Sequence, residues 1–205
     1  MATRIPNLLT FSRIAVIPLL VALFWVEGDG ARWAACALFT LAGITDYLDG
    51  YLARSWDEQS QLGELLDPIA DKILVATTLL LLAAFGRIGG LTLLPAIVIL
   101  CREILVSGLR EFLASVSVGV PVTRLAKWKT GLQMVAIGFL IVGDAGDWVI
   151  PHTAEIGRVG LWLAAVLTVF TGYDYLREGI KHVDQQPTAP LPSAKPARGA
   201  RPARP

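Results

Sequence analysis

The sequence predicts an all-α, polytopic membrane protein with six transmembrane helices and a polar cavity that faces the cytoplasm. The mean hydropathy is +0.58 and 54% of the 205 residues are hydrophobic, which is well above ordinary soluble composition. Apolar stretches of about 15 to 22 residues recur between charged or turn-forming breaks. These breaks alternate between basic and base-poor segments, as the loops on the two sides of a membrane do.

Six stretches are expected to cross the membrane. A span needs about 20 residues, and the first and fifth stretches are shorter than this. Both helices should therefore extend into their polar flanks, which include Ser12 and Arg13 for the first and Lys129 for the fifth. The predicted spans cover residues 14–26, 33–53, 67–85, 91–112, 130–142 and 156–175.

The distribution of charge predicts the orientation. Three breaks, EGDGA, GRIGG and GDAGDWVIPHTAEIG, contain or border only Arg32, Arg87 and Arg158 among basic residues. The other breaks collect most of the remaining lysines and arginines. The positive-inside rule therefore places both termini and residues 54–66 in the cytoplasm.

One domain accounts for the chain. Residues 1–182 form the predicted membrane domain, and residues 183–205 are expected to be a disordered, Pro/Ala/Arg-rich cytoplasmic tail, which either touches anionic headgroups or is simply solvated. Cys36 and Cys101 lie in apolar segments far from both histidines, so a zinc site is not expected. No nucleic-acid partner is expected.

Four aspartates lie within residues 46–71. Asp46 and Asp49 are three residues apart and Asp67 and Asp71 are four apart, so each pair lies on one face of its own helix. Four converging carboxylates repel one another next to lipid and require bound cations or a polar substrate. Oxygen ligands without histidine or thiolate favour Mg²⁺ or Mn²⁺, with Ca²⁺ as a competitor, and four aspartates can share two ions.

The residues between the aspartates suit a phosphorylated ligand. Gly50 and Gly63 lack side chains, which lets a ligand approach their helices closely. Arg54 is placed to hold a phosphate, and Ala53 beside it keeps that surface small. The Asp-Pro pair at 67–68 fits either a helix start or a kink.

Together these positions resemble a known family. The segment fits the pattern DxxDGxxAR, eight residues, then GxxxDxxxD, which is similar to the signature of the CDP-alcohol phosphotransferases. The fixed positions are Asp46, Asp49, Gly50, Ala53, Arg54, Gly63, Asp67 and Asp71.

The resemblance implies a six-helix membrane enzyme, in the cytoplasmic membrane of a bacterium and as a homodimer, that uses two divalent ions, Mg²⁺ or Mn²⁺. It implies that Asp46, Asp49, Asp67 and Asp71 are metal ligands and that Asp71 is also the general base. It further implies that CDP-linked lipid contacts Asp46, Asp49, Gly50, Ala53, Arg54 and Gly63.

Basic residues further along the chain predict a site for the acceptor. Arg102 and Arg110 are eight residues apart, close to two helical turns, so they share a face. We expect them to bind a phosphorylated acceptor together with Lys127 and Lys129. The alternative is that Arg102 pairs with Glu103 or another carboxylate and that Arg110 pairs with Glu111 or lipid headgroups.

The branch of the family follows from the same basic segment together with PNLLTFSRI and LLDPIADK. They resemble the branch that makes phosphatidylglycerophosphate and CMP from CDP-diacylglycerol and sn-glycerol 3-phosphate. Inositol phosphate, serine and phosphatidylglycerol remain alternative acceptors, although a basic pocket favours a phosphorylated one over serine. Asn7 and Thr10 in the first of these segments are also interpreted as caps of the first helix.

Two other functions remain open. A divalent-cation transporter would also place acids in a membrane, but its acids should follow the membrane depth, whereas these cluster at the cytoplasmic ends of two helices. A metal-dependent hydrolase of CDP-lipid would use the same ligands with water as nucleophile. The basic residues from Arg102 to Lys129 favour a real acceptor over water.

Overall fold

The computed structural model describes residues 4–56, 61–115 and 124–184, and it gives side-chain positions there except at 4–11, 46–56, 61–65, 67, 68, 115, 124, 126, 127, 178 and 180–184. The described residues form helices and no strand, which confirms the all-α fold class. The helices are α1 (Arg4–Trp25), α2 (Asp29–Trp56), α3 (Gln61–Ala84), α4 (Leu93–Ser115), α5 (Arg124–Val142) and α6 (Thr153–Asp184), with two short 3-10 turns, η1 (Gly90–Thr92) and η2 (Gly143–Gly146).

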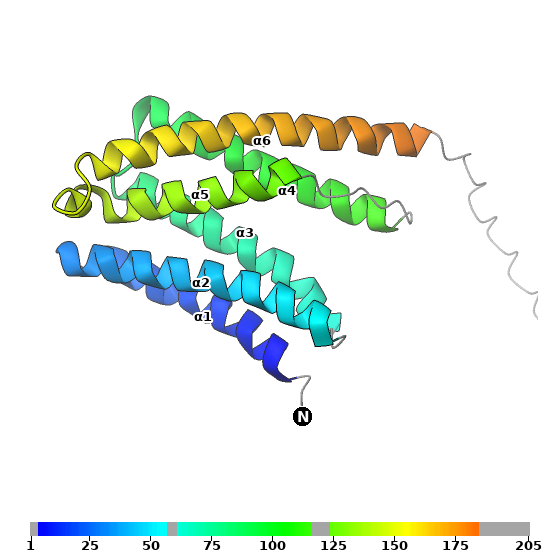
Figure 1. Ribbon diagram of the computed structural model, residues 1–205, viewed down its shortest axis with the longest axis horizontal. Coiled ribbons are helices and arrows are strands. Elements are labelled where there is room, and N and C mark those ends of the chain that lie inside the picture. The colour runs from blue at the N-terminus through cyan, green and yellow to red at the C-terminus, as the bar shows by residue number, and fades with distance from the viewer. Residues whose placement is uncertain (1–3, 57–60, 116–123, 185–205) are drawn as a thin grey trace, which may run out of the picture.

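The helices run side by side along the longest axis of the molecule (Figure 1). α1 packs against α2 and α3, α2 packs against α5, and both α4 and α5 pack against α6. The turn between α1 and α2 and the segment between α5 and α6 lie at the same end of the bundle (Figure 1). The C-terminal end of α2 and the N-terminal end of α3 lie at the opposite end (Figure 1).

The helix ends agree with two expectations and correct two interpretations. α1 begins at Arg4 and α5 at Arg124, so both short stretches do extend into their polar flanks. Asn7 and Thr10 lie inside α1, so they are not its caps. Pro68 lies well past the start of α3 at Gln61, so the pair at 67–68 does not begin a helix. At that position proline has no N–H for the carbonyl four residues earlier.

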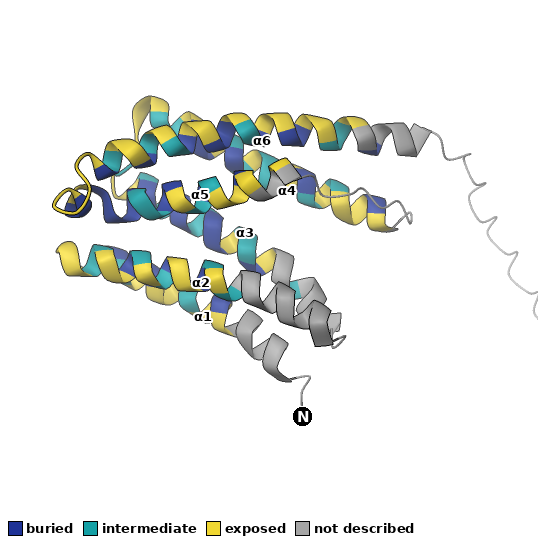
Figure 2. Ribbon diagram, viewed as in Figure 1, coloured by how far each residue is buried: buried dark blue, intermediate teal, exposed yellow. Residues whose placement is uncertain are grey.

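Every helix contributes to one apolar core. Leu20, Phe39, Leu79, Ile99, Ile137 and Leu161, one from each of α1 to α6, are each at most 1% exposed. The outside of the bundle is apolar as well: Leu80, Ile104 and Phe170 are 63%, 68% and 65% exposed. Buried and exposed faces alternate along each helix (Figure 2). A helix that is apolar on both faces is typical of a bundle surrounded by lipid.

Two stretches of the described residues are long and apolar enough to cross a membrane by length and composition, Gly90–Ala114 and Thr153–Arg177. A third, Ser12–Trp25, is apolar but shorter. In the C-terminal part of α2 and the N-terminal part of α3, the structure describes the helical backbone but few of the side chains.

Arg87 ties three elements together at the end of the bundle that holds η2. It follows α3, its Nη1 donates a hydrogen bond to the carbonyl oxygen of Ile141 in α5, and its guanidinium carbon lies 4.5 Å from the ring centroid of Phe24 in α1. Burial and the nearby charge of Arg32 lower the pKa of Arg87 to about 10, while Asp144 opposes this effect. The side chain remains a cation at neutral pH and can make both contacts.

Glycines in α6 allow it to pack closely on α5. A Cβ atom at Gly157 would lie 2.8 Å from Cγ and 3.0 Å from the backbone nitrogen of Leu140. A Cβ atom at Gly160 would lie 3.0 Å from that of Ala136. Small residues at such positions let helix backbones approach within a membrane-type bundle.

We predict that Gly157→Ala destabilises the protein, by about 1–3 kcal/mol, because the added methyl group overpacks a contact with backbone. Gly108→Ala is the matched control: it lies within α4 and its Cβ atom would meet nothing within 4 Å. Thermal unfolding of the detergent-solubilised variants, followed by tryptophan fluorescence, should show a lower midpoint for Gly157→Ala alone. Equal midpoints for the two variants would contradict the close α5–α6 contact.

Candidate active site

The two halves of the aspartate signature lie on consecutive helices. Asp46, Asp49, Gly50, Ala53 and Arg54 are in the C-terminal half of α2, whereas Gly63, Asp67 and Asp71 are in the N-terminal half of α3. Only residues 57–60 separate the two helices, so both halves lie at the same end of the bundle. Of these side chains the structure describes that of Asp71; the others lie outside the described side chains.

The donor set fits a hard divalent cation. Carboxylate oxygens are the ligands that Mg²⁺ and Mn²⁺ prefer, and the two helices bring two pairs of them to one end of the bundle. Among the side chains that the structure describes, no group of three or more His, Cys, Asp or Glu residues has the arrangement of a metal site. Asp46, Asp49 and Asp67 are not among these side chains.

Asp71 lines a small polar cavity between α3, α4 and α5. The cavity has a volume of about 30 Å³. Polar side chains reach it from all three helices, and it is lined by Asp71, Lys72 and Val75 of α3, Glu103 of α4, and Thr130, Gln133 and Met134 of α5. A space of this size takes about one water molecule or one hydroxyl group.

The charges beside this cavity are paired. Lys129 is 2% exposed, and its Nζ makes an ion pair with Glu103 Oε1. Nη1 of Arg102 lies 3.6 Å from the same Glu103 oxygen. The carboxylate of Asp71 is also close enough to Lys129 for its charge to stabilise the ammonium group. Buried charges need such partners because isolated ions are costly to remove from water.

The two arginines of α4 both reach α6. Nη2 of Arg102 donates to Oγ1 of Thr171 at 3.4 Å, and the guanidinium of Arg110 lies 5.8 Å from the ring centroid of Tyr175. Gly172 leaves room for the side chain of Arg102, because a Cβ atom added at Gly172 would lie 3.1 Å from Cγ of Arg102. Arg102 therefore makes the predicted alternative contact with Glu103, whereas Arg110 contacts an aromatic ring.

Of the four predicted acceptor residues, the structure brings Arg102 and Lys129 together at Glu103. Arg110 lies near enough to Arg102 for the two charges to act on each other, which agrees with their predicted common face. The side chain of Lys127 lies outside the described ones.

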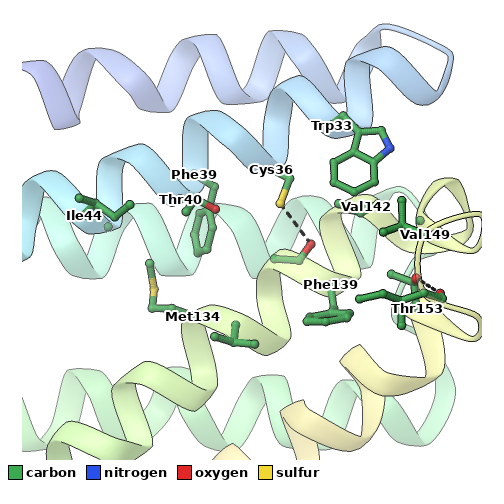
Figure 3. A pocket seen from close by; sticks show the side chains of 15 residues that line it. Trp33, Cys36, Phe39, Thr40, Ile44, Met134, Phe139, Val142, Val149 and Thr153 are labelled. Atoms are coloured by element: carbon green, nitrogen blue, oxygen red, sulfur yellow. Dashed lines mark hydrogen bonds between the residues drawn. The ribbon is translucent and has the colours of Figure 1, made fainter.

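An apolar cleft of about 430 Å³ lies between α2 and α5 (Figure 3). Its walls carry almost no charge, and it runs from Trp33 near the start of α2 to Ile44, two residues before Asp46. The lining residues are Trp33, Cys36, Phe39, Thr40, Gly43, Ile44, Met134, Val135, Gly138, Phe139, Val142, Gly146, Val149, Ile150 and Thr153. Met134 lines both this cleft and the small polar cavity, so the two spaces adjoin.

The end of the cleft away from the aspartates is held by hydrogen bonds. Nε1 of Trp33 donates to the carbonyl oxygen of Ala145 at 3.3 Å, and Oγ1 of Thr153 donates to that of Ile150 at 2.5 Å. Partway along, Sγ of Cys36 lies 3.6 Å from the carbonyl oxygen of Gly138 (Figure 3). The cleft is therefore framed by ordered contacts at one end, and Met134 lies between it and the polar cavity.

Thr130 and Gln133 of the polar cavity were not among the residues that the sequence singled out. Gln133 follows Lys129 by four residues, so both lie on one face of α5. The sequence did show a glutamine one helical turn after a lysine in an apolar segment, which could have drawn attention to Gln133. Its meaning depended on Asp71 and Glu103, which other helices bring to the same place.

Comparison with known proteins decides the family. The family model for CDP-alcohol phosphatidyltransferase matches residues 3–170, most of the chain. This chain belongs to the CDP-alcohol phosphatidyltransferase family. The resemblance inferred from the aspartate signature is thus confirmed, and the match extends from α1 into α6.

Several relatives within the CDP-alcohol phosphatidyltransferase family share one name, CDP-diacylglycerol–glycerol-3-phosphate 3-phosphatidyltransferase. The protein of that name from Rickettsia typhi is 47% identical over 174 residues, which cover 85% of this chain and 96% of the relative. The one from Cereibacter sphaeroides is 36% identical, over 89% of this chain and 98% of the relative. The protein from Arabidopsis thaliana with that name followed by the number 2 is 38% identical, over 85% of this chain and 78% of the relative.

We predict that Glu103→Ala destabilises the protein, because Lys129 would remain buried without its partner. The expected loss is about 3 kcal/mol, the low end for breaking a buried ion pair, because Glu103 itself is 19% exposed. Lys129→Met combined with Glu103→Ala should recover part of this loss, since no buried cation is then left uncompensated. Thermal unfolding of the two single variants and the double variant measures the coupling; strictly additive effects would contradict it.

Proposed function

We propose that this protein transfers the phosphatidyl group of CDP-diacylglycerol to sn-glycerol 3-phosphate, giving phosphatidylglycerophosphate and CMP. The observation that carries the proposal is the shared name of relatives that are 36–47% identical and matched over nearly their full length. The complete aspartate signature and the polar cavity at Asp71 also support the proposed phosphatidyl transfer, because they supply the carboxylates that this chemistry needs.

The proposed setting is the cytoplasmic membrane of a bacterium, with the chain as a homodimer. In this setting all six helices span the bilayer, residues 1–182 form the membrane domain, and both termini and the active site face the cytoplasm. The apolar outer surface of the bundle and the distribution of basic residues support this arrangement. α6 extends through residues 183 and 184, so the predicted tail begins later than expected; residues 185–205 lie outside the described residues and remain a proposed cytoplasmic tail.

The proposed metal ligands are Asp46, Asp49, Asp67 and Asp71, holding two Mg²⁺ or Mn²⁺ ions. When bound, such ions neutralise phosphate oxygens and stabilise the leaving group in displacement at phosphorus. The support for this set is its chemistry, which is carboxylate alone, and its placement on two neighbouring helix ends. Gly50, Ala53, Arg54 and Gly63 would border the nucleotide, together with Asp46 and Asp49.

Asp71 is the proposed general base. It would take the proton of the acceptor hydroxyl as that oxygen forms a bond to the lipid-side phosphorus, and the bond from this phosphorus to the CMP oxygen would break. The position of Asp71 in a polar cavity shared by three helices supports this role. Proton affinity is lowered near metals, so the hydroxyl must be held close to the carboxylate.

Arg102, Arg110, Lys127 and Lys129 are proposed to attract and hold the acceptor phosphate. Arg102 and Lys129 already share Glu103, and Asp71 and Lys72 line the same cavity, so three cations lie beside two carboxylates. The surplus positive charge beside the cavity suits a dianionic group better than a neutral acceptor such as serine. This balance favours a phosphorylated acceptor.

The apolar cleft between α2 and α5 is proposed to hold an acyl chain of CDP-diacylglycerol. Its lining is almost wholly apolar, and it leads to the helix turn before Asp46. The stretch of α2 from Trp33 to Ile44 spans about 16 Å, at about 1.5 Å per residue. Its contact with the polar cavity at Met134 would let one lipid place its chain and its phosphate side by side.

The test of this function is a defined assay of the purified full-length protein with CDP-diacylglycerol, sn-glycerol 3-phosphate and Mg²⁺ or Mn²⁺. We predict release of CMP and formation of phosphatidylglycerophosphate in equal amounts, and loss of both on chelation of the metal. Asp71→Asn should lower turnover by about 10²–10⁴-fold, because it removes the base but keeps the shape of the side chain.

Two results would contradict the proposal. CMP release that does not depend on the acceptor would indicate a hydrolase, and full activity of Asp71→Asn would exclude its role as base. Inositol phosphate and serine, tested in parallel, measure the acceptor preference directly.

A second prediction concerns the lipid. Gly138→Leu should narrow the cleft, because the residue lies in its wall and a Cβ atom there already comes within 3.7 Å of Cys36 Sγ. We expect a raised KM for long-chain CDP-diacylglycerol and little change for a short-chain analogue. Ala37→Leu is the control, since Ala37 is exposed on α2, the helix that faces Gly138 across the cleft, and does not itself line the cleft. Equal effects on both chain lengths would exclude the cleft as the acyl site.

A further inference from the structure

The described part of the chain holds an unusual buried acceptor at the polar cavity. Gln133 is 2% exposed, and its Oε1 has no hydrogen-bond partner among the described residues. A buried amide oxygen without a partner loses its hydrogen bonds to water and gains none in return. The side chain also lines the cavity that contains Asp71. The terminal torsion of glutamine has a broad energy profile, so this oxygen can rotate toward a ligand in the cavity.

The polar groups around Gln133 differ in whether they can accept a hydrogen bond or a proton from a hydroxyl group. Glu103 is already paired with Lys129 and Arg102, and Lys72 can only donate hydrogen bonds. Asp71 can remove a proton. The amide oxygen of Gln133 is neutral and accepts a hydrogen bond without taking the proton. It is therefore suited to hold a hydroxyl group that does not react.

The position of Gln133 along α5 fits the shape of the proposed acceptor. Lys129 and Gln133 are four residues apart, which places their Cβ atoms about 5–6 Å apart on one face of the helix. If the acceptor phosphate lies at Lys129, the three-carbon backbone extends along this face past Gln133 toward Asp71. Glycerol 3-phosphate carries one hydroxyl at its reacting end and a second one between that end and the phosphate.

We propose that Gln133 is a specificity-determining residue whose Oε1 accepts a hydrogen bond from the non-reacting 2-hydroxyl of the acceptor. It thereby selects a vicinal diol phosphate over a simple alcohol phosphate and holds the terminal hydroxyl at Asp71. This inference rests on the proposed function. It assigns no proton transfer to Gln133, which acts on the acceptor and leaves the lipid substrate untouched.

The experiment compares two acceptors on the full-length enzyme, sn-glycerol 3-phosphate and 3-hydroxypropyl phosphate, which lacks only the 2-hydroxyl. For the unmodified chain we expect kcat/KM to favour glycerol 3-phosphate by about 10- to 100-fold, the value of one hydrogen bond to a buried acceptor. Gln133→Met keeps the length of the side chain without its amide. This variant should lose activity with glycerol 3-phosphate only, so that the preference falls toward unity.

The ratio of the two acceptors cancels any loss of folded enzyme, since both are measured on one preparation. Val75→Ala is the matched control, because it changes an apolar wall of the same cavity and should leave the ratio unchanged. A Gln133→Met preference equal to that of the unmodified chain, or a ratio that Val75→Ala lowers as strongly, would overturn the inference. If the unmodified chain makes no lipid product from glycerol 3-phosphate, the proposed function itself has failed.

Discussion

A charge inside an apolar helix bundle needs a partner close by, and this constraint organises the part of the molecule that carries its polar groups. Glu103 of α4 pairs with Lys129 of α5 and lies 3.6 Å from Arg102, which in turn reaches Thr171 of α6. A single carboxylate thus links three helices. Because Lys129 is fixed in this way, the next turn of α5 brings Gln133 to the cavity of Asp71.

The close packing of α5 on α6 supports the same arrangement from the other side. Gly157 and Gly160 allow close contacts with Leu140 and Ala136 that an added Cβ atom would crowd. Helices in lipid gain little from the hydrophobic effect on association, so such close contacts provide much of the attraction between them. The position of α5 is therefore set by an ion pair at one end and by backbone proximity along its length.

The sequence predicted the features that depend on local pattern. Apolar stretches gave the all-α class and the extension of the first and fifth helices, and the spacing from Asp46 to Asp71 gave the family. It did not predict the contacts of Arg110 with Tyr175 or of Gln133 with the polar cavity, because these depend on how distant helices pack. The pairing of Arg102 with Glu103 was foreseen only as an alternative, because neighbouring residues of opposite charge can also turn to different partners.

Adjacent residues of α5 serve two different environments. Of these two spaces Gln133 lines the polar cavity, whereas Met134 lines both the polar cavity and the apolar cleft. Consecutive residues of a helix point about 100° apart, so one helix can present a polar face to Asp71 and an apolar face to α2. An amphiphilic substrate needs both environments in contact, since its chain and its phosphate are covalently joined. The flexible thioether of Met134 at their boundary suits a surface that must adapt to a bound chain.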